Sequence, residues 1–326
     1  MERRRKGLMA KPSALSSFKI SRKNIRFSFR SFVLLFFFLA ILAFVPPIFL
    51  HLRLKRHAQI QRQKCGWLQN PPLVCAHGGD SSRAPANTMA AYRLAVHSQV
   101  DCMEIDASRS HDGVLMAIHD RDLQNMSGDN SAKVGNLNLS QIKRLDAGFG
   151  FSKEFQHQEV PTLDDALKFV SDAVKQVIVD AKVGPPRFEE GLAADLLLTM
   201  NKIQCRNCII WAKTDSLVRE LKKLSHDVVV GYIVMKDPIT GMQSDLLRME
   251  RADVIGVYHV LVNENLVGKA HRAGKKVYAW TVDNIYSMQK MLFARVDSII
   301  TSQPRLLQQV MEDIRNQCID DGFLLN

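Results

Sequence analysis

The sequence predicts a (β/α)8 barrel of the TIM type, preceded by one amino-terminal transmembrane helix. Three observations lead to this prediction. Short runs rich in Val, Ile and Leu alternate with amphipathic helical patterns from residue 72 onward, which is typical of a parallel sheet covered by helices. Eight such runs occur in roughly 260 residues, as expected for a closed barrel, and a doubly wound open sheet is the alternative. Ahead of them lies a long uncharged segment.

That uncharged segment is Phe32–Leu50, nineteen residues that would cross a hydrocarbon core of about 30 Å as a helix. A cleaved signal peptide would end in small residues, whereas "HLRLKRH" follows directly here. We therefore expect a signal anchor. The expected organisation is a basic cytoplasmic tail at 1–31, the anchor at 32–50, a linker at 51–70, the barrel domain at 71–316 and a short tail at 317–326.

Charge favours one orientation of the anchor. Residues 1–64 hold fifteen Lys or Arg and one acidic residue, which accounts for more than the whole net positive charge of the chain. The folded part that follows therefore carries a small net negative charge and lacks the basic surface expected of a nucleic-acid-binding domain. The ten Lys or Arg of residues 1–30 favour a cytoplasmic amino terminus, hence a type II protein with a lumenal or extracellular domain. The sequons at Asn125 and Asn138 suit that side. Counted over only the twenty residues on each side of the apolar segment, however, the numbers of Lys and Arg are equal, at five each. An organelle transit peptide is the alternative interpretation of this leader.

The expected elements follow in order along the chain. Strands are predicted at 72–77, 102–107, 176–182, 208–213, 227–234, 253–259, 276–282 and 297–302. Helices are predicted at 87–98, 187–201, 215–224, 263–273, 284–293 and 303–315. Because Asp-Gly is a strong hairpin signal, residues 114–119 should fold back antiparallel on the second strand. An insertion is expected at about 121–162, with one helix near 140–145.

The six cysteines do not indicate a disulfide-rich scaffold, because a domain of this length can build its own core. The pair Cys205 and Cys208 lacks a second pair of zinc ligands, so it is either a disulfide or two free thiols. Cys75 and Cys102 are expected in the core.

Polar residues gather at the carboxyl ends of the predicted strands, where barrel enzymes place their active groups. Three carboxylates converging on one rim would repel one another and call for a cation such as Mg²⁺ or Ca²⁺. Two histidines beside them would suit a base and an acid, and the whole set suits cleavage of a phosphodiester. The residues are His77, Glu104, Asp106, His119, Asp180 and Lys182.

These residues lie within a longer pattern, "AHGG…APANT…AYRLA…EIDASRSHDGVLMAIHD…NLSQIKRLDAG…VPTLDDAL…VDAK…WTVDN…VDSIITSQP". The pattern resembles the glycerophosphodiester phosphodiesterase family over roughly residues 72–305, and the anchored architecture is similar to plant-type members. The resemblance implies a metal-dependent hydrolysis of a glycerophosphodiester to glycerol 3-phosphate and an alcohol. It also implies a small-molecule phosphodiester as the partner, beside the membrane that holds the anchor.

The resemblance assigns a role to each matching residue. His77 and His119 correspond to the catalytic pair. Glu104 and Asp106 correspond to two metal ligands, and Asp180 stands where the third ligand is usually Glu. The lysine that lines the phosphate pocket corresponds to Lys182, and an aromatic wall of the pocket corresponds to Trp280.

Two motifs depart from the family. Gly78 replaces the usual arginine of His-Arg-Gly, and Ala86 replaces the usual glutamate of Pro-Glu-Asn-Thr. Arg83, in the same loop, is a candidate phosphate ligand in place of the arginine. The departures keep a second hypothesis open, namely a weakened or inactive relative that binds a phosphodiester or a lipid headgroup.

Overall fold

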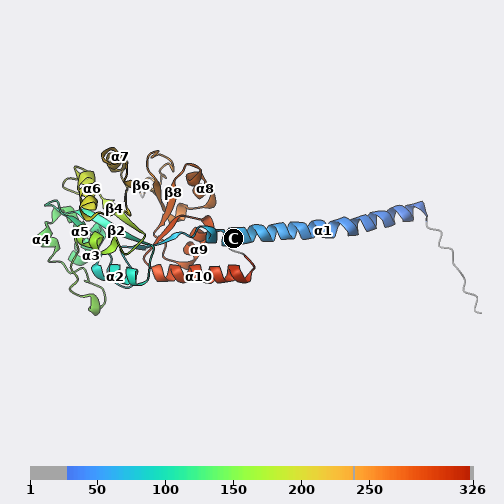
Figure 1. Cartoon of the computed structure of the whole chain (residues 1–326), viewed down its shortest axis with the longest axis horizontal. Coiled ribbons are helices and arrows are strands. Elements are labelled where there is room, and N and C mark those ends of the chain that lie inside the picture. Colours follow the sequence, from blue (N-terminus) through green and yellow to red (C-terminus); the bar gives the residue numbers. More distant parts are fainter. Residues whose placement is uncertain (1–27, 238, 324–326) are drawn as a thin grey trace, which may run out of the picture. The chain divides into compact units, whose positions relative to one another are not determined.

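The computed structural model describes residues 28–237 and 239–323, which fall into two compact units divided between residues 57 and 58. Helix α1 (Phe29–Cys65; Figure 1) contains the predicted anchor. The apolar side chains of this anchor are exposed. Among the described residues it is the one helix long and apolar enough to cross a membrane. The helix continues past residue 50 to Cys65, so most of the segment expected as a linker is helical.

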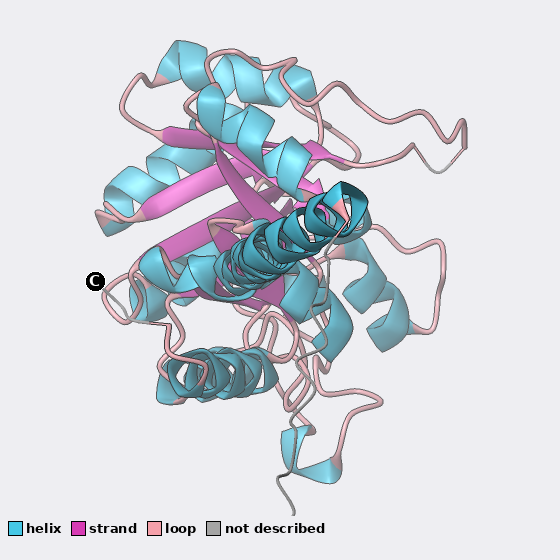
Figure 2. Cartoon of the chain, turned by 90° about the vertical axis from the view of Figure 1, so that its right-hand side faces the viewer, coloured by secondary structure: helices cyan, strands magenta, loops and turns pink. Residues whose placement is uncertain are grey.

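The second unit is a closed parallel barrel. Strand β1 (Leu73–His77) pairs with β2 (Cys102–Arg109) on one side and with β9 (Ser298–Thr301) on the other, which closes the ring. Strands lie inside a layer of helices (Figure 2). The other barrel strands are β4 (Gln176–Lys182), β5 (Cys208–Ala212), β6 (Val229–Val234), β7 (Val254–Tyr258) and β8 (Lys276–Trp280). The predicted barrel is confirmed, and the open sheet is wrong.

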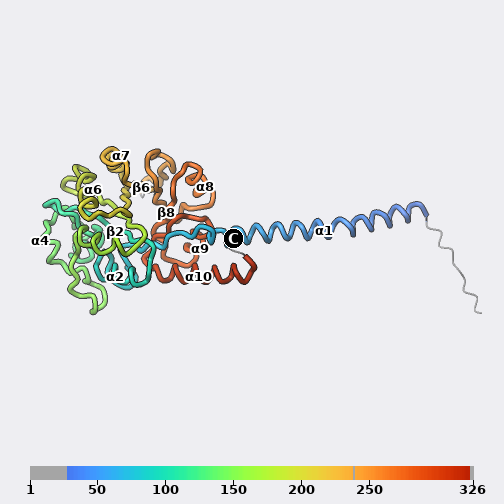
Figure 3. The backbone as a smooth tube through the Cα atoms, viewed as in Figure 1, coloured from blue at the N-terminus to red at the C-terminus, as the bar shows by residue number. Residues whose placement is uncertain are grey.

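Several of the helices that follow the strands begin at polar capping residues, as in α8 and α9, where Asn263 and Asn284 each accept a backbone N–H. Figure 3 traces these strand–helix units along the chain. The helices are α2 (Met89–His97), α5 (Leu163–Val170), α6 (Leu192–Ile203), α7 (Asp215–Leu224), α8 (Glu264–Arg272), α9 (Ile285–Ala294) and α10 (Pro304–Asp320). Of these, α5 was not predicted, although Thr162 and Asp165 form a capping box at its start.

The predicted hairpin is confirmed, because β3 (Leu115–Ala117) pairs antiparallel with the end of β2. The insertion holds more structure than expected. Besides α4 (Leu139–Ile142) it contains α3 (Asp120–Ser127) and the short 3-10 turns η2 (Val134–Asn136) and η3 (Lys153–Phe155). The insertion packs on its own small apolar cluster, which includes Met116, Ile118, Leu123, Val134 and Ile142.

The interior of the barrel is filled by a second apolar cluster, in which Trp211 of β5 is the largest side chain. Two glycines on the next strands make room for its indole ring. A Cβ atom added at Gly256 would lie 2.8 Å from two carbons of that ring, and one at Gly231 would lie 3.0 Å from the Cβ of Trp211. Trp211 therefore supports the carboxyl-end pocket from below.

All six cysteines form disulfides, which the sequence did not indicate as a set. The bridges join Cys65 to Cys318, Cys75 to Cys102 and Cys205 to Cys208. Cys75 and Cys102 are buried, as expected, and face each other in register on β1 and β2. Cys65 and Cys318 come together from positions 253 residues apart, so the packed domain extends past the predicted limits of 71 and 316. The helical turn η1 (Gly66–Gln69) adds the buried Trp67.

Candidate active site

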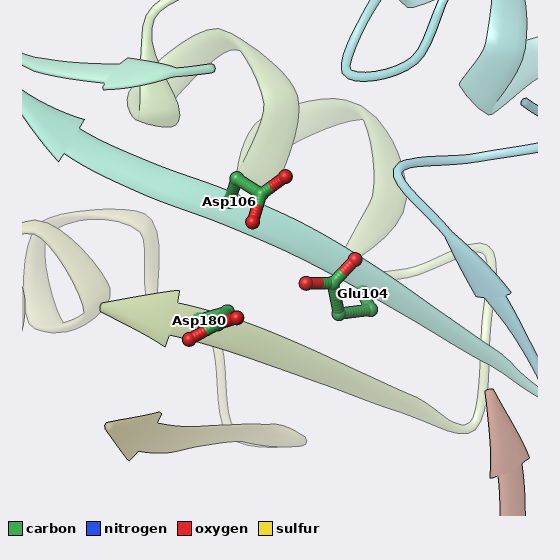
Figure 4. A group of neighbouring side chains, drawn as sticks. All are labelled: Glu104, Asp106 and Asp180. Carbon is green, nitrogen blue, oxygen red and sulfur yellow. The ribbon is translucent and has the colours of Figure 1, made fainter. Parts of the chain in front are cut away.

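Three buried carboxylates meet at the carboxyl ends of two neighbouring strands. Glu104 and Asp106 project from β2, two residues apart and therefore on the same face, and Asp180 projects from β4 (Figure 4). One oxygen of each lies within 4.8 Å of the others. The register brings them together, because Asp106 is the direct partner of Asp180 in the β2–β4 pairing.

Neighbouring groups hold these carboxylates in place. The backbone N–H of Gly78 donates to Oε2 of Glu104 at 3.0 Å, and the side-chain amide of Asn87 donates to Oδ2 of Asp106 at 2.8 Å. The ammonium of Lys182 lies 2.7 Å from Oδ1 of Asp106 and also pairs with Asp180. Lys182 thus neutralises only part of the negative charge.

Burial and mutual repulsion disfavour the ionised forms of these carboxylates. Burial, and next the charge of Asp106, raise the pKa of Glu104 well above its usual range. Burial also raises the pKa of Asp180, although Lys182 opposes it. For Asp106 burial acts in the same direction, but Lys182 and the histidines hold its pKa below the usual range. Like charges gathered out of water favour a bound cation.

The donor set fits a hard divalent cation. All three candidate ligands are carboxylates, the type that Mg²⁺ and Ca²⁺ prefer. Oδ1 of Asp180 is buried and accepts no hydrogen bond from the part of the chain that the structure describes. An ion on this oxygen and on Glu104 and Asp106 would satisfy it.

His119 caps helix α3. Its Nδ1 accepts the backbone N–H of Arg121 at 3.1 Å, and Asp122 accepts the backbone N–H of His119 in return. Since Nδ1 is an acceptor, the hydrogen of the neutral ring lies on Nε2. Burial, and next the charge of Lys182, lower the pKa of His119 to about 4.

His77 ends β1 and lines the same pocket. Burial lowers its pKa to about 4, although Asp106 acts in the opposite direction. Both imidazoles are therefore neutral at pH 7. A neutral ring with a free lone pair can accept a proton.

A pocket with about 410 Å³ of empty space, open to solvent, joins these groups. Of the residues proposed from the sequence, it is lined by His77, Glu104, His119, Asp180, Lys182 and Trp280. Asp106 lies beside it, paired with Lys182. Arg83 is not among the lining residues, and its guanidinium lies 3.4 Å from Asp80.

The pocket contains two cations that the sequence analysis did not find, Arg121 and Lys213. A signal for Lys213 exists in the sequence. Trp211-Ala-Lys213 at the end of β5 repeats the spacing of Asp180-Ala-Lys182 at the end of β4. No comparable signal marks Arg121, because its place depends on the course of the insertion.

The two departures from the family pattern touch each other. Gly78 has a φ of +61°, a left-handed conformation that favours glycine. A Cβ atom there would lie 3.2 Å from the Cβ of Ala86 and from the backbone nitrogen of Asn87. An arginine at this position would strain the loop as it stands.

Comparison with known proteins agrees with this geometry. The model of the "Glycerophosphoryl diester phosphodiesterase family" matches residues 77–306. The glycerophosphodiester phosphodiesterase GDPD4 of Arabidopsis thaliana is 51% identical over 282 residues, which cover 86% of each chain. A glycerophosphodiester phosphodiesterase of Caldanaerobacter subterraneus is 30% identical over 72% of this chain and 96% of its own.

Solved structures share the fold. The phosphodiesterase of Oleispira antarctica, solved in complex with the product sn-glycerol-3-phosphate, has a TM-score of 0.65 and 24% identity, over 74% of this chain and 97% of that one. A Silicibacter pomeroyi protein has a TM-score of 0.66 and 20% identity, over 77% and 98%. On the family match and the identity to the curated relatives, the chain belongs to the glycerophosphoryl diester phosphodiesterase family.

Proposed function

We propose that this protein hydrolyses glycerophosphodiesters to glycerol 3-phosphate and an alcohol. The observation that carries the proposal is the convergence of two neutral histidines, three crowded carboxylates and Lys182 around one pocket. Cleavage of a phosphodiester needs a proton acceptor, a proton donor and compensation of the phosphate charge. The residues of this pocket match each requirement.

The carboxylates of Glu104, Asp106 and Asp180 would hold one divalent cation, Mg²⁺ or Ca²⁺. When bound, it would supply positive charge against the phosphate oxygens. Lys182 would add a second positive charge, and Trp280 would form a wall of the substrate pocket. Its indole N–H is buried and finds no acceptor in the described residues, so a substrate oxygen could accept it. We leave Arg83 out, because Asp80 holds it away from the lining.

The histidines would have separate roles. To act as a base through Nε2, His119 would need its hydrogen on Nδ1, which would break the cap with the N–H of Arg121. His77 would therefore be the base that takes a proton from the attacking water, and this proton would then pass to the departing alcohol oxygen. The Nε2–H of neutral His119 would donate a hydrogen bond to a substrate oxygen.

Turnover of glycerophosphocholine by the purified full-length protein tests the proposal. We expect release of choline and glycerol 3-phosphate with Mg²⁺ or Ca²⁺ present, measured by an enzyme-coupled assay. The matched control is the Glu104→Gln variant, which should release neither product. The alternative function, a phosphodiester-binding relative, would show binding of the ligand by calorimetry and no turnover by the wild type.

We also propose a single-pass type II membrane protein with a lumenal or extracellular barrel. The apolar stretch in α1 supports the anchor. The three disulfides support an oxidising compartment. Of the two proposed glycosylation sites, Asn125 agrees with this placement because it is exposed on α3, whereas Asn138 is half-buried and its Oδ1 caps α4.

The anchor gives a direct prediction. The full chain is expected to stay in the membrane fraction during alkaline carbonate washing, because about 19 uncharged residues are long enough to span the bilayer. Deleting residues 1–50 should move the protein to the supernatant, as followed by immunoblot. Recovery of intact full-length protein in the wash would contradict the anchor.

A further inference from the structure

The family pattern that this chain resembles has an arginine after the first histidine, whereas this chain has Gly78, whose left-handed backbone and close neighbours would strain such a side chain. Other cationic side chains of the pocket must therefore compensate the negative charge of the phosphate. Arg83 does not meet it, because its guanidinium lies beside Asp80. The cations that line the pocket are Lys182, Arg121 and Lys213.

Lys213 follows β5 and stands next to Lys182 at the rim. Ala212 of β5 is the direct partner of Ala181 of β4, so the next residue on each strand is a lysine. Lys182 is taken up by two carboxylates, whereas the described residues offer Lys213 neither a hydrogen bond nor an ion pair. Burial, and next the charge of Lys182, lower the pKa of Lys213. Lys213 therefore lies near other positive charges and has no ion-pair partner among the described residues.

Arg121, on the first turn of α3, also lines the pocket. Its only ion pair among the described residues is weak, with Nε 3.8 Å from Oδ1 of Asp122. Because Nδ1 of His119 accepts the backbone N–H of Arg121, the backbone of Arg121 is held beside this histidine. It adds positive charge that acts on both histidines.

The indole N–H of Trp211 also indicates a ligand in this pocket. Trp211 is 2% exposed and lines the pocket, yet its indole N–H has no acceptor in the described part of the chain. A buried donor without a partner costs free energy that a bound acceptor would restore. Trp211 near the end of β5 and Lys213 just after it both line this pocket.

We propose that Lys213 and Arg121 bind the non-bridging phosphate oxygens in place of the missing arginine, with Trp211 as an additional donor. With both histidines neutral, the three carboxylates and the three cations of the site cancel. A divalent cation would then leave two positive charges, which match the dianion of a phosphate monoester above its second pKa of about 6. The naming of that monoester as glycerol 3-phosphate rests on the proposed function.

The test is calorimetric binding of glycerol 3-phosphate, at pH 8 with Mg²⁺, to the full-length protein. Lys213→Met and Arg121→Gln should each weaken binding by about ten- to a hundredfold, as expected for loss of a charge-assisted hydrogen bond. Lys213→Arg should largely restore the affinity. Lys223→Met, an exposed lysine on α7, is the matched control and should bind like the wild type.

Melting temperatures of all variants are measured alongside, so that a folding defect is recognised. Unchanged affinity in both Lys213→Met and Arg121→Gln overturns the proposal, as does a wild-type protein that binds no glycerol 3-phosphate. Wild-type protein that binds in a Lys213-dependent way but turns over no glycerophosphodiester upholds this inference and refutes the proposed function.

Discussion

Replacing Glu104 by Gln or Asp106 by Asn is expected to lower kcat/KM for glycerophosphocholine by about three orders of magnitude or more. A catalytic cation contributes several kcal/mol of charge stabilisation, and about 1.4 kcal/mol corresponds to a factor of ten. Each substitution removes one negative charge from the three that would hold the ion. The measurement is steady-state kinetics together with elemental analysis of bound Mg²⁺ and Ca²⁺.

The two substitutions should differ in stability. Glu104 has a raised pKa because of burial and of its two carboxylate neighbours, so Glu104→Gln relieves repulsion and should keep the melting temperature of the metal-free protein. Asp106→Asn instead deprives the half-buried Lys182 of an ion-pair partner and should lower the melting temperature.

Glu159→Gln is the control, because Glu159 is exposed and lies outside the pocket. It should retain both activity and metal. Treatment with EDTA should remove the activity of the wild type, and added Mg²⁺ or Ca²⁺ should restore it. Full activity in EDTA, with no metal in the protein, would show that these carboxylates do not hold a catalytic ion.

Loss of either histidine is expected to have the second largest effect. His77→Ala and His119→Ala should each lower kcat by about 10²–10⁴-fold, the usual contribution of a general acid or base. His119 also caps α3, so its alanine variant should lose roughly 0.5–2 kcal/mol of stability as well.

His119→Asn separates the two effects. Asparagine is a good N-cap residue, so this variant should keep the melting temperature of the wild type yet show the same fall in kcat. A fall of less than about tenfold in a folded variant would remove that histidine from the catalytic pair.

The pH profile tests the same pair. A base whose pKa is lowered stays unprotonated down to that pKa, and burial lowers the pKa of His77 to about 4. We therefore expect kcat/KM to stay constant down through pH 6.5 and to fall only as the pH approaches about 4. A fall of kcat/KM already between pH 6 and 7 would contradict the proposal that burial lowers the pKa of the catalytic base His77.

The barrel and most of the site were predictable from local patterns. Runs that are apolar on both faces predict parallel strands, and Asp112-Gly113 predicts the hairpin that carries β3 back along β2. Because all parallel strands end on one rim, the polar residues at their ends could be placed together. His77, Glu104 and Asp180 line one pocket, as their positions at the strand ends predict.

Other features depend on where the folded chain brings distant segments. The bridge between Cys65 and Cys318 spans 253 residues, and cysteine spacing alone does not determine pairing. Helix α5 was missed although its amphipathic pattern and the capping box of Thr162 and Asp165 both indicate it, because it is only eight residues long. The role of Arg121 follows from the turn at His119, which only the packed insertion fixes.

The sequence by itself determined the barrel, the hairpin and the set of strand-end residues, because backbone pairing and burial impose their period on neighbouring residues. The tertiary structure decided the disulfides, the hydrogen on Nε2 of His119, and the position of Lys213 and Arg121 in the pocket. It also showed that Arg83 pairs with Asp80 rather than lining the pocket. Such contacts are set by the course of loops and by register between strands, and neither leaves a periodic trace in the chain.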